Sequence, residues 1–315
     1  MYVGLDIGGT KCAAVIGSLG KEVEILDKIT FPTAGKTPDE ILNLFSKFIK
    51  DKQKDYKIDG IGIACGGPLD SKKGIIKKPP SLPLWDNIEI VKYFEDKFGI
   101  KTYLKNDADA CAVAEWKYGA GKGTENMIFI TFGTGFGSGL ILNGRLYSGT
   151  NDNAGEIGHV RLRKTGPIGY NKAGSCEGFC SGSGIRRLAL IELEKCRKKG
   201  LYADFLQKIG GEDNVTAKTL AELARAGDEF SNRVYKISGK MLGETLSILI
   251  DLFNPEKIVI GGVFMRSGDL LYPHAEKVIK KESLCYSEQV VKVVPALLSE
   301  NIGDVSALVV AKGDL

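Results

Sequence analysis

The chain has 315 residues, of which 43% are hydrophobic and 26% are charged. This length suits two domains with a sizeable core, and the composition excludes a disordered, collagen-like or coiled-coil protein. The formal charge of +4 is too small for a chain of this length to indicate binding to nucleic acid or to an anionic membrane.

The cysteines and the N-terminus indicate a reducing cytoplasm. Asp6 comes too early for a signal peptide, and no apolar run approaches the roughly 18 residues of a membrane-spanning helix. An odd number of dispersed cysteines does not resemble a disulfide framework. They are Cys12, Cys65, Cys111, Cys176, Cys180, Cys196 and Cys285.

The first third of the chain predicts a mixed α/β fold that opens with a meander. Strands are expected over residues 2–7, 12–16 and 23–31, because glycine-rich turns separate three apolar runs. Thr37 and Glu40 form a capping box that starts a helix, with Pro38 at its first position. Its buried stripe is expected to comprise Ile41, Leu44, Phe45, Phe48 and Ile49.

A second set of elements repeats this order. After a strand over 61–65, a helix over 90–98 and a strand over 102–104, the chain begins again at Met127. Strands over 127–132 and 139–142 flank a glycine turn, and 144–147 forms the next hairpin arm. Because the pattern recurs about 125 positions after Asp6, we expect two similar lobes that face each other.

The remaining segments predict a functional loop and further helices. Residues 149–183 are glycine-rich and longer than an ordinary connection, which favours a substrate loop. An amphipathic helix is expected over 234–253, a strand over 257–260 and a closing helix over 303–312. His274 follows Tyr272 and Pro273 at an expected helix start, so we interpret it as a structural residue and not as a ligand-binding one.

Two glycine turns, in Asp6–Lys11 and Thr131–Gly137, each follow a predicted strand. Neither a P-loop nor a Rossmann fingerprint is present. Each turn alone could be a simple hairpin, but the pair indicates backbone amides that converge on nucleotide phosphates, with Thr10 and Thr134 as hydroxyl donors. Asp6 is placed to hold Mg²⁺ through water, because this hard ion prefers oxygen ligands.

Two aspartates open a predicted helix that contains Trp116. From the residues alone, Asp107 or Asp109 could serve as its N-cap. A positioned carboxylate can also act as a general base toward an alcohol, so both interpretations stay open at this point.

With these motifs, the sequence resembles the ROK family of bacterial sugar kinases and repressors, within the actin, hexokinase and heat-shock ATPase superfamily. The resemblance runs over nearly the whole chain and implies a two-lobed α/β ATPase fold with a cleft between the lobes. The matching segments are Asp6–Lys11, Gly133–Gly137, Asn254–Gly262, Lys105–Ala110, Glu156–His159 and Glu177.

The resemblance also implies roles for individual residues. Asp107 would be the general base, and Asp109 would be left as the helix cap. The sugar would be bound by Asn106, Glu156, His159, Glu177, Ser81 and Gly67. ATP and Mg²⁺ would be bound by Asp6, Gly8, Gly9, Thr10, Lys11, Gly133, Thr134, Gly135, Gly137, Gly261 and Gly262.

Two departures from the family pattern stand out. Many relatives hold the sugar loop with zinc, but Ile168, Tyr170 and Ser175 occupy the expected cysteine positions. An alternative set of His159, Cys176 and Cys180 is conceivable, but we expect a metal-free loop that packs around Tyr170 and Phe179. The second departure is Ser81, which replaces an asparagine that often contacts sugar.

These observations favour an ATP- and Mg²⁺-dependent hexose kinase, with glucose first among the possible sugars. Mannose, fructose, allose, N-acetylglucosamine and N-acetylmannosamine stay open as alternatives. A sugar-sensing repressor is disfavoured, because only five residues precede Asp6 and leave no room for a helix-turn-helix. A cytoskeletal or chaperone-type ATPase would have no use for the polar groups of the sugar loop.

The resemblance further implies a homodimer. We expect an N-terminal lobe of residues 1–108 plus 298–315 and a C-terminal lobe of residues 109–297.

Overall fold

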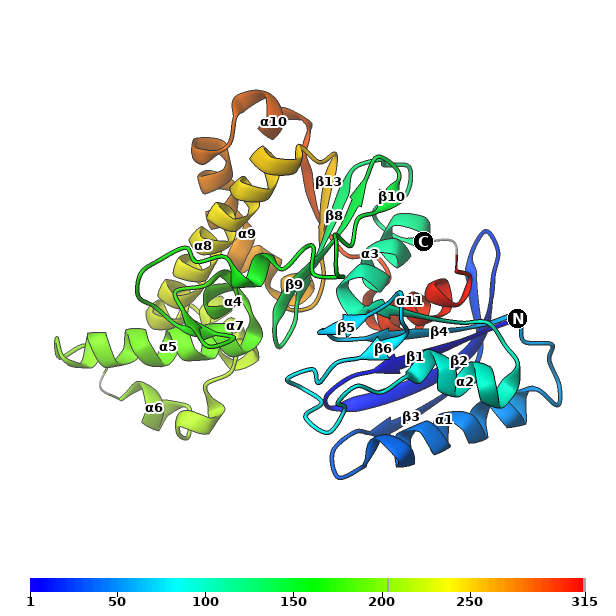
Figure 1. The fold of residues 1–315 in the computed structure, drawn as a ribbon. Coiled ribbons are helices and arrows are strands. Elements are labelled where there is room, and N and C mark those ends of the chain that lie inside the picture. Colours follow the sequence, from blue (N-terminus) through cyan, green and yellow to red (C-terminus); the bar gives the residue numbers. More distant parts are fainter. Residues whose placement is uncertain (203, 314–315) are drawn as a thin grey trace. The chain divides into compact units, whose positions relative to one another are not determined.

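The computed structural model describes residues 1–202 and 204–313, which form two compact units (Figure 1). Unit 1 comprises residues 1–129, 139–155 and 297–313, and unit 2 comprises residues 130–138 and the described part of 156–296. The chain first crosses between the units at 129/130, whereas the predicted lobes divide at 108/109. The crossing at 296/297 lies one residue from the predicted 297/298.

Unit 1 contains a five-stranded sheet of order β3-β2-β1-β4-β7, in which the predicted meander is confirmed. β1, β2 and β3 pair antiparallel, while β4 and β7 continue the sheet in parallel. The strands are β1 (Tyr2–Ile7), β2 (Lys11–Leu19), β3 (Val23–Pro32), β4 (Gly60–Cys65) and β7 (Thr102–Asn106). The two-stranded sheet of β5 (Leu69–Asp70) and β6 (Ile75–Ile76) lies between β4 and β7 in the sequence.

Helices cover both faces of the first sheet (Figure 1). α1 (Pro38–Lys52) and α2 (Ile90–Phe98) lie on one face, and α3 (Asp107–Tyr118) and α11 (Ile302–Ala311) lie on the other. The short turn η3 (Ser299–Asn301) directly precedes α11. The capping box of Thr37 and Glu40 is confirmed. In the predicted stripe of α1, Leu44 is only half-buried and Leu42 is buried instead.

Glycines in the sheet allow α11 to approach unusually closely. A Cβ added to Gly62 would lie 2.2 Å from the carbonyl oxygen of Ala307, and one added to Gly4 would lie 2.7 Å from Leu308 N. The opposite face of the sheet carries large apolar side chains such as Leu5 and Ile63, which belong to the same core cluster as Phe45 of α1. Small residues on one face and large ones on the other therefore fix the layer order.

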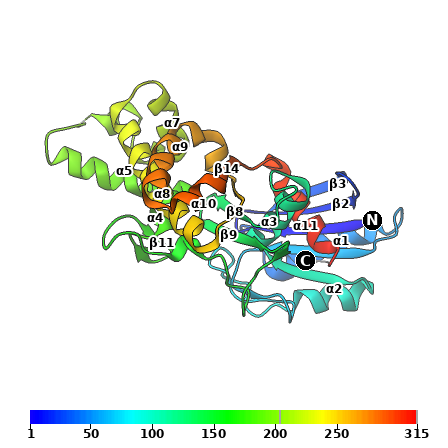
Figure 2. The ribbon, with the colours of Figure 1, turned by 90° about the horizontal axis from the view of Figure 1, so that it is seen from above.

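Unit 2 is mainly helical, and α8 and α9 run alongside each other (Figure 2). Its helices are α4 (Cys176–Cys180), α5 (Gly182–Arg197), α6 (Phe205–Lys208), α7 (Ala217–Arg225), α8 (Glu229–Phe253), α9 (Val263–Glu282) and α10 (Cys285–Val290). Short elements are η1 (Ile157–His159), β11 (Ile168–Gly169), β12 (Lys172–Ala173) and η2 (Glu212–Asn214). The predicted substrate loop 149–183 contains a turn, a hairpin and the short helix α4.

The second five-stranded sheet has the order β10-β9-β8-β13-β14. Its strands are β8 (Met127–Phe132), β9 (Phe136–Leu142), β10 (Arg145–Leu146), β13 (Lys257–Ile260) and β14 (Lys292–Pro295). The expected strand, glycine turn, strand repeat is confirmed, because β8 and β9 are neighbours as β1 and β2 are. No helix in the described residues is both long and apolar enough to span a bilayer.

The expected helix start at Tyr272 and Pro273 is wrong, because both residues lie inside α9. The break in this helix is at Ser267, whose backbone has φ −135° and ψ 19°. Arg225 bridges this break by donating hydrogen bonds to the Asp269 carboxylate and to the Arg266 carbonyl oxygen. Extensive packing of α9 on α8 outweighs the backbone hydrogen bond that Pro273 cannot donate.

A buried glutamate fastens the C-terminal segment to α3. The Glu115 side chain is 0% exposed and accepts hydrogen bonds from the amides of Ala120 (2.8 Å), Leu297 (3.2 Å) and Leu298 (2.8 Å). Leu297 and Leu298 begin the part of unit 1 that leads into α11. The buried carboxylate therefore accepts from three backbone donors at once and ties them to α3.

We predict that Glu115→Ala lowers the free energy of unfolding by about 2–4 kcal/mol, because it removes the shared acceptor of three amides and leaves a cavity in place of a buried side chain. Glu115→Gln keeps one acceptor oxygen and should cost less. Urea denaturation followed by circular dichroism measures both, with the exposed Glu194→Ala as a control that changes stability by about 0.5 kcal/mol or less. Equal losses of stability in Glu115→Ala and Glu194→Ala would contradict the role of Glu115.

Candidate active site

The N-terminus of α3 presents two of the predicted site residues. Asn106 is the N-cap, and its Oδ1 accepts hydrogen bonds from the amides of Ala108 (2.9 Å) and Asp109 (3.5 Å). The expectation that Asp109 caps this helix is therefore wrong. Asp109 lies inside the first turn, is 3% exposed and accepts a hydrogen bond of 2.6 Å from Ser148 Oγ.

Because Asn106 caps the helix through Oδ1, its side-chain nitrogen Nδ2 lies beside the loop after β4. A Cβ added to Gly67 would lie 3.3 Å from Asn106 Nδ2, and one added to Gly66 would lie 3.7 Å from Asp107 Oδ2. The structure thus brings Gly67, Asn106 and Asp107 together. Asp107 is the first residue of α3, where the helix dipole favours a negative charge.

Three aspartates of unit 1 share one region. Burial, followed by the charges of Asp107 and Asp304, raises the pKa of Asp6 to about 6, and the charges of Lys11 and Lys28 oppose this shift. Asp107 is exposed at the surface, yet its carboxylate lies among enough protein atoms that desolvation raises its pKa as well. A hard divalent cation held through water would relieve the repulsion that Asp6 experiences, although the three carboxylates are not grouped closely enough to coordinate one ion together.

Sequence reasoning missed Asp304. It is buried in α11, and its Oδ2 lies 2.5 Å from Lys28 Nζ. The two residues are 276 positions apart, so only the packing of α11 on the sheet reveals the contact. No local motif could have indicated it.

The first glycine turn joins β1 to β2 and is open to solvent. Gly8 N donates to the Lys11 carbonyl oxygen (3.1 Å), and Thr33 holds the turn by donating from Oγ1 to the Gly8 carbonyl oxygen (2.6 Å). A Cβ added to Gly9 would lie 2.6 Å from Ser81 Cβ, so the predicted sugar contact Ser81 adjoins this turn. Thr10 is exposed at the tip.

The second turn and the nucleoside-side motif come together in unit 2. Ser183 Oγ donates to the Thr134 carbonyl oxygen (2.8 Å), and Gly182 N donates to the Gly133 carbonyl oxygen (2.8 Å). Gly262 has φ +65°, and an added Cβ would lie 2.2 Å from the Phe132 carbonyl oxygen. Only glycine therefore allows the start of α9 to lie beside the turn.

The predicted sugar residues of unit 2 lie close to this second turn. Glu177 Oε2 accepts a hydrogen bond of 3.2 Å from Phe136 N, and a Cβ added to Gly135 would lie 3.0 Å from the same oxygen. Gly158, between Glu156 and His159 in the sequence, has no room for a side chain against the Phe136 carbonyl oxygen. Glu156 is exposed and His159 is half-buried.

The positions where relatives carry zinc-binding cysteines make other contacts. The Tyr170 ring lies edge-on to the His159 ring, with centroids 4.5 Å apart, and Lys172 Nζ donates to the His159 carbonyl oxygen. Ser175 is the N-cap of α4 and accepts a hydrogen bond from Gly178 N. The expected packing around Tyr170 is present, and Phe179 packs against Gly166.

The alternative set of His159, Cys176 and Cys180 is not assembled. Cys176 Sγ accepts a hydrogen bond from Thr245 Oγ1, and the Cys180 thiol lies against the Ser238 carbonyl oxygen, so both cysteines face α8. In the part of the chain that the structure describes, no three His, Cys, Asp or Glu side chains are grouped to hold a metal ion.

The two units, each built on a sheet with a glycine turn between its first hairpin strands, have the mixed α/β fold of the actin-like ATPases. The sequence matches the ROK family over residues 2–313. This chain therefore belongs to the ROK family.

Individual relatives are of two kinds. A glucokinase of Halalkalibacterium halodurans is 34% identical over 86% of this chain and 82% of its own length. The DNA-binding transcriptional dual regulator NagC of Escherichia coli is 29% identical over 90% of this chain and 68% of its own length. A ROK glucokinase of Streptomyces griseus, solved with glucose and AMPPNP, has a TM-score of 0.79 and 27% identity, with 99% of both chains covered. Together these findings identify the chain as a sugar phosphotransferase.

We predict that Asp109→Asn changes the pH dependence of stability. Burial raises the pKa of Asp109 to about 6, so the folded state holds this proton more tightly than the unfolded state, and stability falls as pH rises through about 6. Asparagine still accepts the bond from Ser148 but cannot ionise. Relative to wild type, the variant should gain about 1 kcal/mol more at pH 7.5 than at pH 5. Parallel pH profiles in urea denaturation would contradict this assignment.

Proposed function

We propose that this protein transfers the γ-phosphate of ATP to a hydroxyl group of a hexose, with glucose as the preferred acceptor. The relatives named glucokinase support this acceptor, and the S. griseus complex with glucose and AMPPNP supports ATP as the donor.

The observation that carries the proposal is the start of α3. Asp107 is fixed at the first helical position, its neighbour Asn106 turns its amide toward Gly67, and Asp6 lies within the same electrostatic field. A carboxylate with a raised pKa can take the proton of an attacking alcohol near neutral pH. We assign Asp107 this role.

The glycine turns would bind the nucleotide. Amides of the turn at Gly8–Lys11 and of the turn at Gly133–Gly137 would contact phosphate oxygens, while Gly261 and Gly262 would lie on the nucleoside side. Asp6 would hold Mg²⁺ through water, and the ion would neutralise charge on the phosphates. Thr33 and Ser183 keep the two turns in shape through their hydrogen bonds to carbonyl oxygens.

The sugar would be recognised by side chains that match its hydroxyl groups. Glu156, Glu177 and His159 can accept or donate hydrogen bonds to several hydroxyls, as can Asn106, Ser81 and the backbone at Gly67. Glu177 also accepts from Phe136 N, which fixes the carboxylate before any sugar arrives.

Three further features rest on the family resemblance and belong to the same proposal. They are dependence on Mg²⁺, a homodimer and a cytoplasmic location. Light scattering of the purified protein tests the dimer directly.

We predict that Asp107→Asn lowers kcat/KM roughly 10²- to 10⁴-fold, because the acceptor alcohol loses its base. Asp109→Asn is the matched control, since it makes the same substitution two residues further on and should leave kcat within a few-fold of wild type. A coupled assay of ADP release measures turnover, and circular dichroism confirms folding. A folded Asp107→Asn enzyme with wild-type turnover would overturn the assignment.

We predict that glucose gives the highest kcat/KM in a panel with mannose, fructose, allose, N-acetylglucosamine and N-acetylmannosamine. The ratio is the relevant measure because it compares stabilisation of the transition state between competing acceptors. A higher value for either N-acetyl sugar would move the substrate to the N-acetylhexosamines, while no ADP release with any sugar would contradict the kinase function. In that event, a gel-shift assay with promoter DNA tests the repressor alternative that NagC represents.

A further inference from the structure

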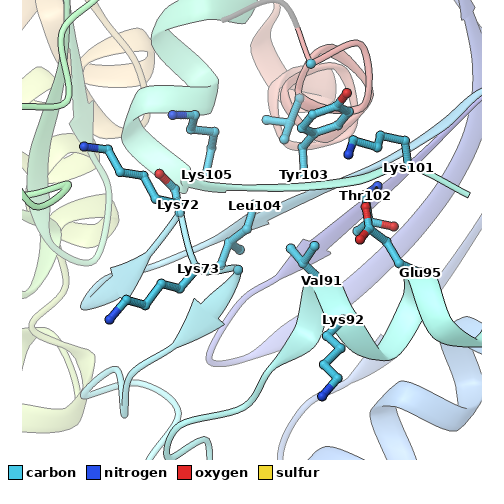
Figure 3. A pocket seen from close by; sticks show the side chains of 14 residues that line it. Lys72, Lys73, Val91, Lys92, Glu95, Lys101, Thr102, Tyr103, Leu104 and Lys105 are labelled. Carbon is cyan, nitrogen blue, oxygen red and sulfur yellow. Dashed lines mark hydrogen bonds between the residues drawn. The ribbon is translucent and has the colours of Figure 1, made fainter.

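A lysine-rich pocket lies along the edge of the first sheet, away from the glycine turns in sequence. Its volume is about 520 Å³, a size that suits a small ligand. It is formed by the segment after β5, by α2 and by β7, which is the last strand of the sheet. The charged side chains that line it are Lys72, Lys73, Lys92, Glu95, Lys101 and Lys105 (Figure 3).

This pocket concentrates positive charge. Five lysines face one glutamate, which gives the lining a net charge of +4, equal to that of the whole chain. In the described part of the chain, Lys72, Lys101 and Lys105 have no carboxylate within ion-pair distance, in contrast to Lys28, Lys52 and Lys77 of the same unit.

The acidic groups near the pocket are already engaged. Glu95 Oε1 accepts a hydrogen bond of 3.1 Å from Thr102 N. Asp152 accepts hydrogen bonds from Ser71 N and Ser71 Oγ, both of 2.8 Å. These hydrogen bonds hold both carboxylates in place, and neither forms an ion pair with a lysine of the pocket in the described residues.

The side chains are arranged around a common space. Figure 3 shows the ammonium groups of Lys72 and Lys105 on the same side of the pocket and Lys101 beside the Tyr103 ring, while Lys73 and Lys92 point outward. Leu104 and Val91 form an apolar floor. Ammonium groups on flexible stems bind phosphate groups as point charges, and several of them together favour an anion that carries more than one negative charge.

Protection of a sheet edge explains only part of this arrangement. Lysines on an edge strand prevent pairing with other strands, which accounts for Lys101 and Lys105. It does not account for Lys72, which comes from the segment after β5 and points to the same side of the pocket as Lys105. Their joint placement favours a ligand.

From this convergence we propose that the pocket is a second binding site, for a small anion that carries two or more phosphate groups. Phosphate groups at one end of the anion would lie beside Lys72 and Lys105 and those at its other end beside Lys101, and the outer lysines would add long-range attraction. The site is separate from the glycine turns assigned to ATP and does not depend on the sugar kinase activity.

The test uses tripolyphosphate as the probe, with isothermal titration calorimetry on the full chain in magnesium-free buffer. The pocket variant is Lys72→Glu/Lys101→Glu, which leaves Lys105 beside Asn106 unchanged. The matched control is Lys47→Glu/Lys50→Glu on α1, because it alters the net charge equally at exposed positions elsewhere in unit 1. A third variant, Thr10→Val, weakens phosphate binding at the first glycine turn.

We expect the dissociation constant to rise at least tenfold in the pocket variant and less than threefold in the other two. Equal affinity of wild type and the pocket variant would overturn the proposal. So would an equal loss in the α1 control, which would indicate a general charge effect, or a loss confined to Thr10→Val, which would place the probe at the glycine turns. Circular dichroism shows whether the Lys72→Glu/Lys101→Glu variant is folded. If it is not, Lys72→Gln/Lys101→Gln takes its place, and the same tenfold rise in the dissociation constant is required.

Discussion

The transition from strand β7 to helix α3 is the constraint on which the candidate site depends. The chain changes direction between Asn106 and Asp107. The side-chain oxygen Oδ1 of Asn106 accepts hydrogen bonds from two of the amides that every helix start leaves without a partner in the helix. Because this bonding uses only the oxygen of the amide, the nitrogen stays beside Gly67. One side chain thus fixes the helix, orients Asp107 and keeps a donor for a ligand.

The carboxylates gathered near this helix start are costly for the fold. Asp6, Asp107 and Asp304 repel one another, and burial adds to the rise in the pKa of Asp6. Lys28 offsets part of this through its ion pair with Asp304. Crowding of negative charges in a partly dry region is expected where a cation binds, because the cation offsets their mutual repulsion.

Local patterns predicted the elements well, and long-range packing decided the rest. The bounds of β1, β8 and α2 match the expectation, because apolar runs between glycines leave few alternatives. The segment from Asn106 to Asp109 offers three capping side chains, and the pairing of Asn106 with Cys65 in the sheet selects the first. Pro273 follows a local rule that the contact between α8 and α9 overrides, and Asp304 carries no local signal at all.

The segment 156–183 shows how a loop can be shaped by many weak contacts. Tyr170 and Asn171 both have positive φ, which costs energy for residues other than glycine, yet the turn holds the Tyr170 ring against His159. Ser175 starts α4 and also donates to the Gly169 carbonyl oxygen, and two cysteines anchor this helix on α8. Each contact is modest, but all of them restrict the same short hairpin and helix. The position of His159 therefore depends on several contacts at once. A substitution that removes one of these contacts leaves the others in place, so the loop should lose order in proportion to the number of contacts removed.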